Sequence, residues 1–340
     1  MIKKPKWAGV LFVSLLSILL CSCGSESPVY QTGFVAMDTY IALTVYGKSA
    51  ESAAKAAKEE VMRIESLMSA TDPDSEVSKI NEMAGETVTI SDDTEKVIRA
   101  ALETGKESGG ALDITLRPVI TEWGFTTGNY KIPDEETLDN LLEKVDYRSV
   151  KVGDNTVFLP FGEQIDLGAA AKGYAGDRAV AVLKENGVES AIISLGGNVQ
   201  ALGAKIGGTS WNIAVNNPFD EGNMCLLKLE NASVVTSGNY ERYFEGEDGK
   251  RYHHIIDPAD GYPADNGIVS ATITGESGLK CDALSTAVFV MGAEKAEKLW
   301  REKGGFEMLL VTEDKRIILT EGLTDVFTNL SDMEVSEIKR

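Results

Sequence analysis

The sequence Tyr-His-His-Ile-Ile-Asp-Pro at 252–258 opens the stretch that decides how this chain is interpreted. A Gly/Pro turn follows at 261–263, and an apolar, β-branched run at 268–274 then favours a strand. Cys-Asp-Ala-Leu-Ser-Thr at 281–286 begins a helical pattern. The stretch therefore predicts a strand followed by a helix, with polar side chains next to both.

Four of these polar side chains point to chemistry. The chain has two histidines, His253 and His254, and imidazole is the side chain that titrates nearest to neutral pH. Asp282 and Thr286 are four residues apart, so in a helix their oxygen atoms lie on one face. A carboxylate beside a hydroxyl forms part of a site for a hard cation such as Mg2+.

A plainer interpretation of the same residues stays open. Asp is a favoured N-cap, so Asp282 could simply begin a helix over 283–292 and leave Thr286 on the surface. One of two adjacent histidines in a strand must point outward, and His254 could merely orient the turn at 257–258. The spacing alone does not decide between a cap and a metal site.

The composition excludes some classes of function. The 340 residues include 53 acidic and 33 basic side chains, which gives a net charge of −20. Nucleic acid and anionic lipid surfaces would both repel such a chain. The length fits one large domain or two modest ones.

The first residues resemble the signal of a bacterial lipoprotein. Three lysines within residues 3–6 precede an apolar run over 7–20 that is too short for a comfortable membrane span. Leu-Cys-Ser-Cys-Gly at 20–24 then resembles a lipobox with Cys23 as the acceptor. We expect a signal peptide over 1–22, a polar tether over 23–32, and a lipid anchor that holds the chain on the extracytoplasmic face of the cell membrane. An ordinary secretory signal with incidental cysteines is the alternative.

The remaining chain is predicted to form one α+β domain over 33–331, with mixed and antiparallel sheets, flanking helices and two lobes around a cleft. Apolar residues at threes and fours predict a helix over 50–69. A single strand is expected over 33–46, a helix over 93–107 that ends at Gly109 and Gly110, and a frayed polar tail over 332–340. Cys225 and Cys281 are expected to stay free thiols.

A lysine stands where the helix dipole disfavours it. Residues 164–168 are predicted to end a strand, and a helix opens over 169–175. Lys172 lies in its first turn, near the positive end of the helix, where a bound anion would explain its presence. A surface lysine on an Ala-rich helix is the alternative interpretation.

Nine motifs in this order resemble the ApbE family, the FAD:protein FMN transferases. They are Met-Asp-Thr at 37–39, Pro-Asp-Ser-Glu at 73–76, Gly-Ala-Leu-Asp at 110–113, Trp-Gly-Phe at 123–125, Asp-Leu-Gly-Ala-Ala-Ala-Lys-Gly-Tyr-Ala at 166–175, Leu-Gly-Gly-Asn at 195–198, Thr-Ser-Gly-Asn at 236–239, His-His-Ile-Ile-Asp-Pro at 253–258 and Asp-Ala-Leu-Ser-Thr at 282–286. No one motif is sufficient, but the ordered set is highly specific.

The resemblance implies a single catalytic domain that binds FAD in its cleft. The FAD-binding residues that it implies are Met37, Thr71, Ala111, Leu112, Asp113, Asp166, Lys172 and Ile256. It implies Mg2+ at the pyrophosphate, held by the backbone oxygen of Ala169 and the side chains of Asp282 and Thr286. Lys172 would neutralise charge and His254 would accept the proton of the incoming hydroxyl.

The implied reaction transfers FMN to a Thr or Ser of an acceptor flavoprotein, a subunit of Rnf or Nqr type outside the cytoplasm, and releases AMP. Three departures from the family pattern stand out: Asp38 in place of glycine, Thr71 in place of an aromatic residue, and Ser285 in place of a second acid. Two alternatives remain, a Mg2+-dependent FAD pyrophosphatase and a non-catalytic flavin-binding lipoprotein.

Overall fold

The computed structural model describes residues 28–340, so the predicted signal peptide and Cys23 lie outside the described residues. Its strands are β1 (Val29–Ala36), β2 (Thr39–Tyr46), β3 (Thr87–Thr89), β4 (Lys151–Gly153), β5 (Thr156–Phe158), β6 (Ser190–Leu195), β7 (Asn198–Leu202), β8 (Trp211–Asn216), β9 (Asn223–Leu229), β10 (Ala232–Gly238), β11 (Tyr243–Glu245), β12 (Arg251–His253), β13 (Ile268–Gly275), β14 (Glu307–Thr312), β15 (Arg316–Thr320), β16 (Phe327–Asn329) and β17 (Glu334–Ile338).

The α-helices are α1 (Ala50–Met68), α2 (Glu76–Glu82), α3 (Asp92–Glu107), α4 (Arg117–Glu122), α5 (Glu135–Leu142), α6 (Ala171–Glu185) and α7 (Gly278–Lys303). Two short 3-10 turns cover Tyr147–Ser149 and Glu321–Leu323. None of the helices between residues 28 and 340 is both long and apolar enough to cross a membrane.

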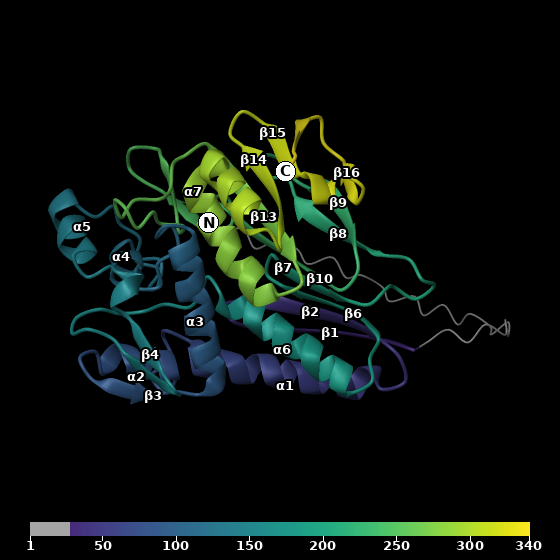
Figure 1. Ribbon diagram of the computed structural model, residues 1–340, viewed down its shortest axis with the longest axis horizontal. Coiled ribbons are helices and arrows are strands. Elements are labelled where there is room, and N and C mark those ends of the chain that lie inside the picture. Colours follow the sequence, from purple (N-terminus) through teal and green to yellow (C-terminus); the bar gives the residue numbers. More distant parts are fainter. Residues whose placement is uncertain (1–27) are drawn as a thin grey trace, which may run out of the picture.

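A nine-stranded sheet forms the centre of the molecule, in the order β1-β2-β6-β7-β10-β13-β14-β15-β17 (Figure 1). Its neighbouring strands pair antiparallel, except that β15 and β17 run parallel. The prediction of an α+β fold with mixed and antiparallel sheets is confirmed.

Helices α1 and α6 lie side by side against the β1, β2 and β6 end of this sheet (Figure 1). The predicted apolar stripe of α1, at residues 54, 57, 61, 64 and 68, is buried there together with Ile41 and Leu43 of β2. The smaller sheet β8-β9-β16 contributes Trp211 and Leu227 to a separate apolar cluster with β10, β14 and β15. The large sheet is thus packed on both faces.

A second group of elements lies at one end of the molecule. Helices α2, α4 and α5 and the three-stranded sheet β3-β5-β4 gather there, away from the strands of the large sheet (Figure 1). This grouping agrees with the expected smaller lobe, whereas the flavin cleft itself stays a prediction.

Helices α6 and α7 approach each other through two glycines. A Cβ atom at Gly173 would lie 2.1 Å from the carbonyl oxygen of Gly278 and 2.7 Å from the Cβ of Asp282. A Cβ at Gly278 would in turn lie 2.6 Å from the carbonyl oxygen of Gly173. Real Cβ atoms do not come so close, so glycine at these positions lets the two backbones meet.

The predicted single strand over 33–46 is wrong. Residues 29–46 form a hairpin, β1 and β2, joined by Met37 and Asp38 with φ angles of 52° and 57°. Both φ angles are positive, as a tight two-residue hairpin turn requires. Asp tolerates this left-handed conformation better than most residues, which explains how it can stand where the family pattern has glycine.

The chain is also ordered further toward both ends than expected. Strand β1 begins at Val29, inside the segment predicted as a polar tether. Residues 334–338, predicted as part of a frayed tail, form β17 in register with β15, and Arg340 stacks 4.7 Å from the ring of Trp300. Backbone pairing holds this polar segment in place.

The expected helix over 283–292 is part of the longer helix α7. This helix begins after Ser277, whose side chain accepts a hydrogen bond from Lys280 N, so the interpretation of Asp282 as the N-cap is wrong. Gly292 has non-helical φ and ψ of 76° and 168° and kinks the helix. Cys225 and Cys281 are free and buried, as predicted.

Replacing Gly173 by Ala tests the close approach of α6 and α7. We expect the free energy of unfolding to fall by about 1–3 kcal/mol, because the added methyl group collides with the backbone of α7. Urea denaturation measures the change. Lys184→Ala, an exposed position of the same helix, should change it by less than about 0.5 kcal/mol. A Gly173→Ala variant as stable as this control would contradict the close approach.

Candidate active site

Three loops meet at one end of the large sheet. They are the β1–β2 turn at Met37 and Asp38, the β6–β7 turn at Gly196 and Gly197, and the segment that follows β10. A Cβ atom at Gly196 would lie 2.1 Å from Thr39 Oγ1, and one at Gly197 would lie 3.2 Å from Glu241 Oε1. The three loops are therefore in contact, although they are far apart in the sequence.

The start of α6 carries an unusual hydrogen bond. Gly173 N donates to Asp282 Oδ2 of α7 over 2.8 Å. Gly173 is the third residue of α6, and the first N–H groups of a helix have no partner within it. The next N–H group, that of Tyr174, bonds to Ala170 O. The Asp282 side chain therefore caps the start of α6. The Ala169 carbonyl oxygen accepts no hydrogen bond among residues 28–340, which leaves it available to a ligand.

The carboxyl group of Asp282 is buried and has no basic partner within ion-pair distance among residues 28–340. Burial raises the pKa of this group, and Lys172 acts in the opposite direction. In such an environment the ionised form of Asp282 is favoured over the protonated form only if a cation binds close to it.

Thr286 lies one turn further along α7 and is half-buried. Its Oγ1 is 3.4 Å from the hydroxyl of Ser237, at the end of β10. Ser285 is fully buried and donates to the carbonyl oxygen of Asp282 over 2.8 Å. The hydroxyl that replaces the second family acid is therefore engaged within its own helix.

The predicted magnesium ligands stay a prediction, and their chemistry fits that ion. The carbonyl of Ala169, the carboxylate of Asp282 and the hydroxyl of Thr286 are the hard oxygen donors that Mg2+ prefers. Residues 28–340 contain no cluster of three or more His, Cys, Asp or Glu side chains that could hold a metal ion.

Lys172 lies near the other titratable side chains of the candidate site. Its Nζ donates to Gly168 O over 3.0 Å and leaves two further N–H groups. Its charge acts on Asp282, on Glu241 and on His254. The structure thus brings these four side chains into one electrostatic neighbourhood.

His254 is held as a neutral imidazole. Its Nδ1 lies 3.1 Å from the carbonyl oxygen of Arg242, so Nδ1 carries the hydrogen and Nε2 stays free to accept a proton. Burial lowers the pKa of His254 to about 4, and the positive charges of Arg242 and Lys172 contribute. Phe125 packs edge-on against the ring, with ring centroids 6.3 Å apart.

His253 has a different surrounding. It is buried, its Nε2 lies 3.2 Å from Ala264 O, and its Nδ1 accepts the N–H of Ile255. Both ring nitrogens are engaged within the fold, which favours His254 as the reactive histidine.

The residues predicted to bind FAD lie in several environments. Asp166 Oδ2 lies 3.6 Å from Arg117 Nη1, whereas the carboxylate of Asp113 is consumed by hydrogen bonds from Thr115 and from Tyr147 N. Met37 N donates to Glu65 Oε1 over 2.5 Å. Any contact of Asp113 with FAD would therefore fall to its backbone.

Three of the remaining residues are apolar and inside the protein. Leu112 and Ile256 are buried, and Ala111 is half-buried. Thr71 lies on an exposed turn after α1, where it contacts Ser69. The hydrogen bonds of Thr71 do not connect it to Lys172, so its predicted contact with FAD stays a prediction.

Sequence reasoning missed Glu241 and Ser237. Although Glu241 is exposed as a residue, loss of hydration around its carboxyl group raises its pKa to about 7, against the opposing charge of Lys172. Both residues lie in or next to the motif at 236–239, which is the signal that could have found them. Two shallow surface depressions, one beside Phe158 and one beside Arg99, contain none of the site residues.

The neutral state of His254, a half-buried residue, predicts a pH dependence of stability. The unfolded chain binds a proton at this histidine below about pH 6.5, whereas the folded chain does so only below about pH 4. The free energy of unfolding should therefore fall as the pH drops through this window.

Replacing His254 by Asn should make that fall smaller, as measured by urea denaturation between pH 7 and pH 4. The His253→Asn variant gives the contribution of the second histidine to this pH dependence, because burial also lowers the pKa of His253. Identical pH profiles for the wild type and His254→Asn would show that His254 is not held neutral by the fold.

Comparison with known proteins places the site in a family. The model of the ApbE family matches residues 37–310. The FAD:protein FMN transferase of Treponema pallidum is 34% identical to this chain, over 92% of this chain and 94% of that protein. The FAD:protein FMN transferase of Klebsiella pneumoniae is also 34% identical, over 87% and 93% of the two chains.

Solved structures agree. The ApbE protein of Thermotoga maritima is 35% identical and superposes with a TM-score of 0.83 over 88% of this chain and 99% of that chain. The flavinyl transferase ApbE of Pseudomonas stutzeri, 26% identical, gives a TM-score of 0.79 over 88% and 97% of the two chains. On sequence and structure together, this chain belongs to the ApbE family.

Proposed function

We propose that this chain transfers FMN from FAD to a hydroxyl group of a protein, in a Mg2+-dependent reaction that releases AMP. The observation that supports the proposal is the buried Asp282 carboxylate, which accepts the Gly173 N–H at the start of α6 and is acted on by the charge of Lys172. The activity named for the relatives from Treponema pallidum and Klebsiella pneumoniae supports it.

The pyrophosphate of FAD is the group to be cleaved. The oxygen of the acceptor hydroxyl forms a bond to the phosphorus of the FMN half, and the bond from that phosphorus to the bridging oxygen breaks. AMP leaves with the bridging oxygen. Mg2+ held by Ala169, Asp282 and Thr286 would withdraw negative charge from the phosphates.

Lys172, near the start of α6, also neutralises negative charge on the phosphates. Its ammonium group has N–H donors beyond the one used by Gly168 O, and they can bind a phosphate oxygen. An ammonium group that is already in place needs no reorganisation as charge develops in the transition state.

His254 accepts the proton of the hydroxyl. Its Nε2 is free and unprotonated at neutral pH, because Nδ1–H is held by Arg242 O and because burial keeps the ring neutral. The lowered pKa makes His254 a weak base, so it serves best once the hydroxyl has begun to bond to phosphorus.

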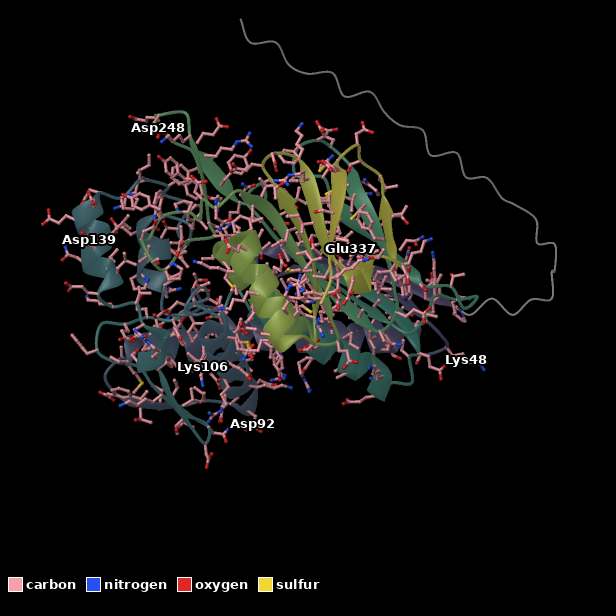
Figure 2. The ribbon with its side chains drawn as sticks, turned by 45° about the horizontal axis from the view of Figure 1, so that its top comes forward. Lys48, Asp92, Lys106, Asp139, Asp248 and Glu337 are labelled. Carbon is pink, nitrogen blue, oxygen red and sulfur yellow. The ribbon has the colours of Figure 1, made fainter. Side chains whose placement is uncertain are left out.

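The acceptor is a flavoprotein outside the cytoplasm, of the Rnf or Nqr type. A lipid anchor at Cys23 would keep the enzyme on the same side of the membrane as this acceptor. Both basic and acidic side chains, among them Lys48, Lys106, Asp92, Asp139, Asp248 and Glu337, lie on separate parts of the surface in Figure 2.

Hydrolysis of FAD to FMN and AMP is the second candidate. Thr71 favours it, because this small side chain on an exposed turn leaves more room for water than the aromatic residue of other family members.

Incubation with FAD, MgCl2 and a purified acceptor flavoprotein tests the reaction. We expect an acceptor that carries one FMN on a Thr or Ser, detected by mass spectrometry, and no product after the metal is chelated. Asp282→Asn and His254→Asn should each slow the transfer by about 100-fold or more. Asp139→Asn, at an exposed carboxylate of α5, should leave the rate unchanged.

Free FMN with unmodified acceptor would assign hydrolysis instead. Asp282→Asn turning over FAD at the wild-type rate would refute the proposed metal ligands.

Replacing Cys23 by Ser tests the anchor. The variant should leave the membrane fraction and appear with the soluble proteins after cell lysis, because it has no acyl chains. Cys281→Ser, at a buried thiol of the body, should stay in the membrane fraction. Retention of the Cys23→Ser variant would contradict the lipid anchor.

A further inference from the structure

Arg117, the first residue of α4, has a guanidinium group that forms one ion pair, with Asp166, and no hydrogen bond among residues 28–340. Its Nη1 is buried without a hydrogen-bond partner, and no hydrogen bond of the other guanidinium nitrogens is present among residues 28–340. The nearest carboxylate oxygen, Asp166 Oδ2, is 3.6 Å away, beyond hydrogen-bonding distance. The side chain is only 17% exposed, so this arginine is enclosed by protein and is not a loose surface cation.

The position of Arg117 connects it to Lys172. Asp166 Oδ1 accepts the N–H of Gly168 over 2.7 Å, and Lys172 Nζ donates to Gly168 O over 3.0 Å. The segment before α4 runs beside the segment that leads to α6, because Asp166 N donates to Ile114 O and Leu116 bridges Gln164. Arg117 and Lys172 therefore both contact the short segment 166–168.

A guanidinium group has five N–H donors in a planar fork that matches a phosphate. In Arg117, Nη1 faces Asp166, and the other guanidinium N–H groups form no hydrogen bond among residues 28–340. A protein with a net charge of −20 repels anions in general, so a substrate with two linked phosphates needs local cations. Lys172 supplies one such cation next to Asp166.

We propose that Arg117 is a second cationic binding residue for the pyrophosphate-bearing substrate, oriented by Asp166. The inference rests on the proposed binding of FAD at this site. The open edge of the guanidinium group contacts the phosphates, and the contact to Asp166 fixes the plane of the fork. Arg117 thus contributes to the preference for a flavin dinucleotide over a flavin without phosphate.

The test compares two flavins, FAD and riboflavin, which has no phosphate. Binding of each to the full chain is followed by the quenching of flavin fluorescence, at two salt concentrations. Arg117→Met should weaken FAD binding about 10-fold and reduce its salt dependence, with the affinity for riboflavin changed less than about 2-fold. Arg117→Lys, which keeps the charge, should recover most of the loss. Arg301→Met, at an exposed arginine near the end of α7, is the matched control.

Two outcomes would overturn the inference. FAD bound equally well by Arg117→Met and the wild type would refute a contact with phosphate, and the proposed function would stand. An equal loss of FAD and riboflavin would assign Arg117 to the support of Asp166 or of the fold. Absence of FAD binding by the wild type would overturn the proposed function and this inference together.

Discussion

The contact between α6 and α7 at Gly173 is the constraint on which the site depends. Two glycines, Gly173 and Gly278, remove the side chains that would otherwise separate the helices. The short distance lets Asp282 accept the N–H of Gly173, one of the N–H groups at the start of α6 that have no partner within the helix. The close approach thus buries the Asp282 carboxylate at the start of α6.

Charge balance explains why this arrangement needs a ligand. Among residues 28–340, Asp282 is buried without an ion-pair partner, and Lys172 forms no ion pair with a carboxylate. Neither group is fully compensated by the protein, which is typical of a site where a cation and an anion bind together. His254 is neutral, so it can act as a base although the positive charges of Lys172 and Arg242 are close to it.

Much of the fold and of the site could be predicted from the sequence. The apolar stripe of α1 follows the helical period, and the four-residue spacing of Asp282 and Thr286 places both on one helix, α7. These features depend on the spacing of residues within one helix, so they can be predicted directly from the sequence. The preference for His254 over His253 also agrees with the hydrogen bonds that engage both nitrogens of His253.

The features that could not be predicted depend on contacts between distant segments. The turn at Met37 and Asp38 needs two residues with positive φ. A sequence with Asp in place of Gly does not predict such a turn. Strand β17 is polar and is held by backbone pairing to β15, which leaves no hydrophobic signal. The consumption of the Asp113 carboxylate by the 147–149 turn is likewise invisible without the fold.

Crystals of the protein grown with Mn2+ in place of Mg2+ would test the central claim most directly, because the anomalous scattering of Mn2+ locates the ion. The account predicts a peak in contact with the carbonyl oxygen of Ala169, the carboxylate of Asp282 and the hydroxyl of Thr286. A Mn2+ ion bound elsewhere, without contact to Asp282 and Thr286, would contradict it.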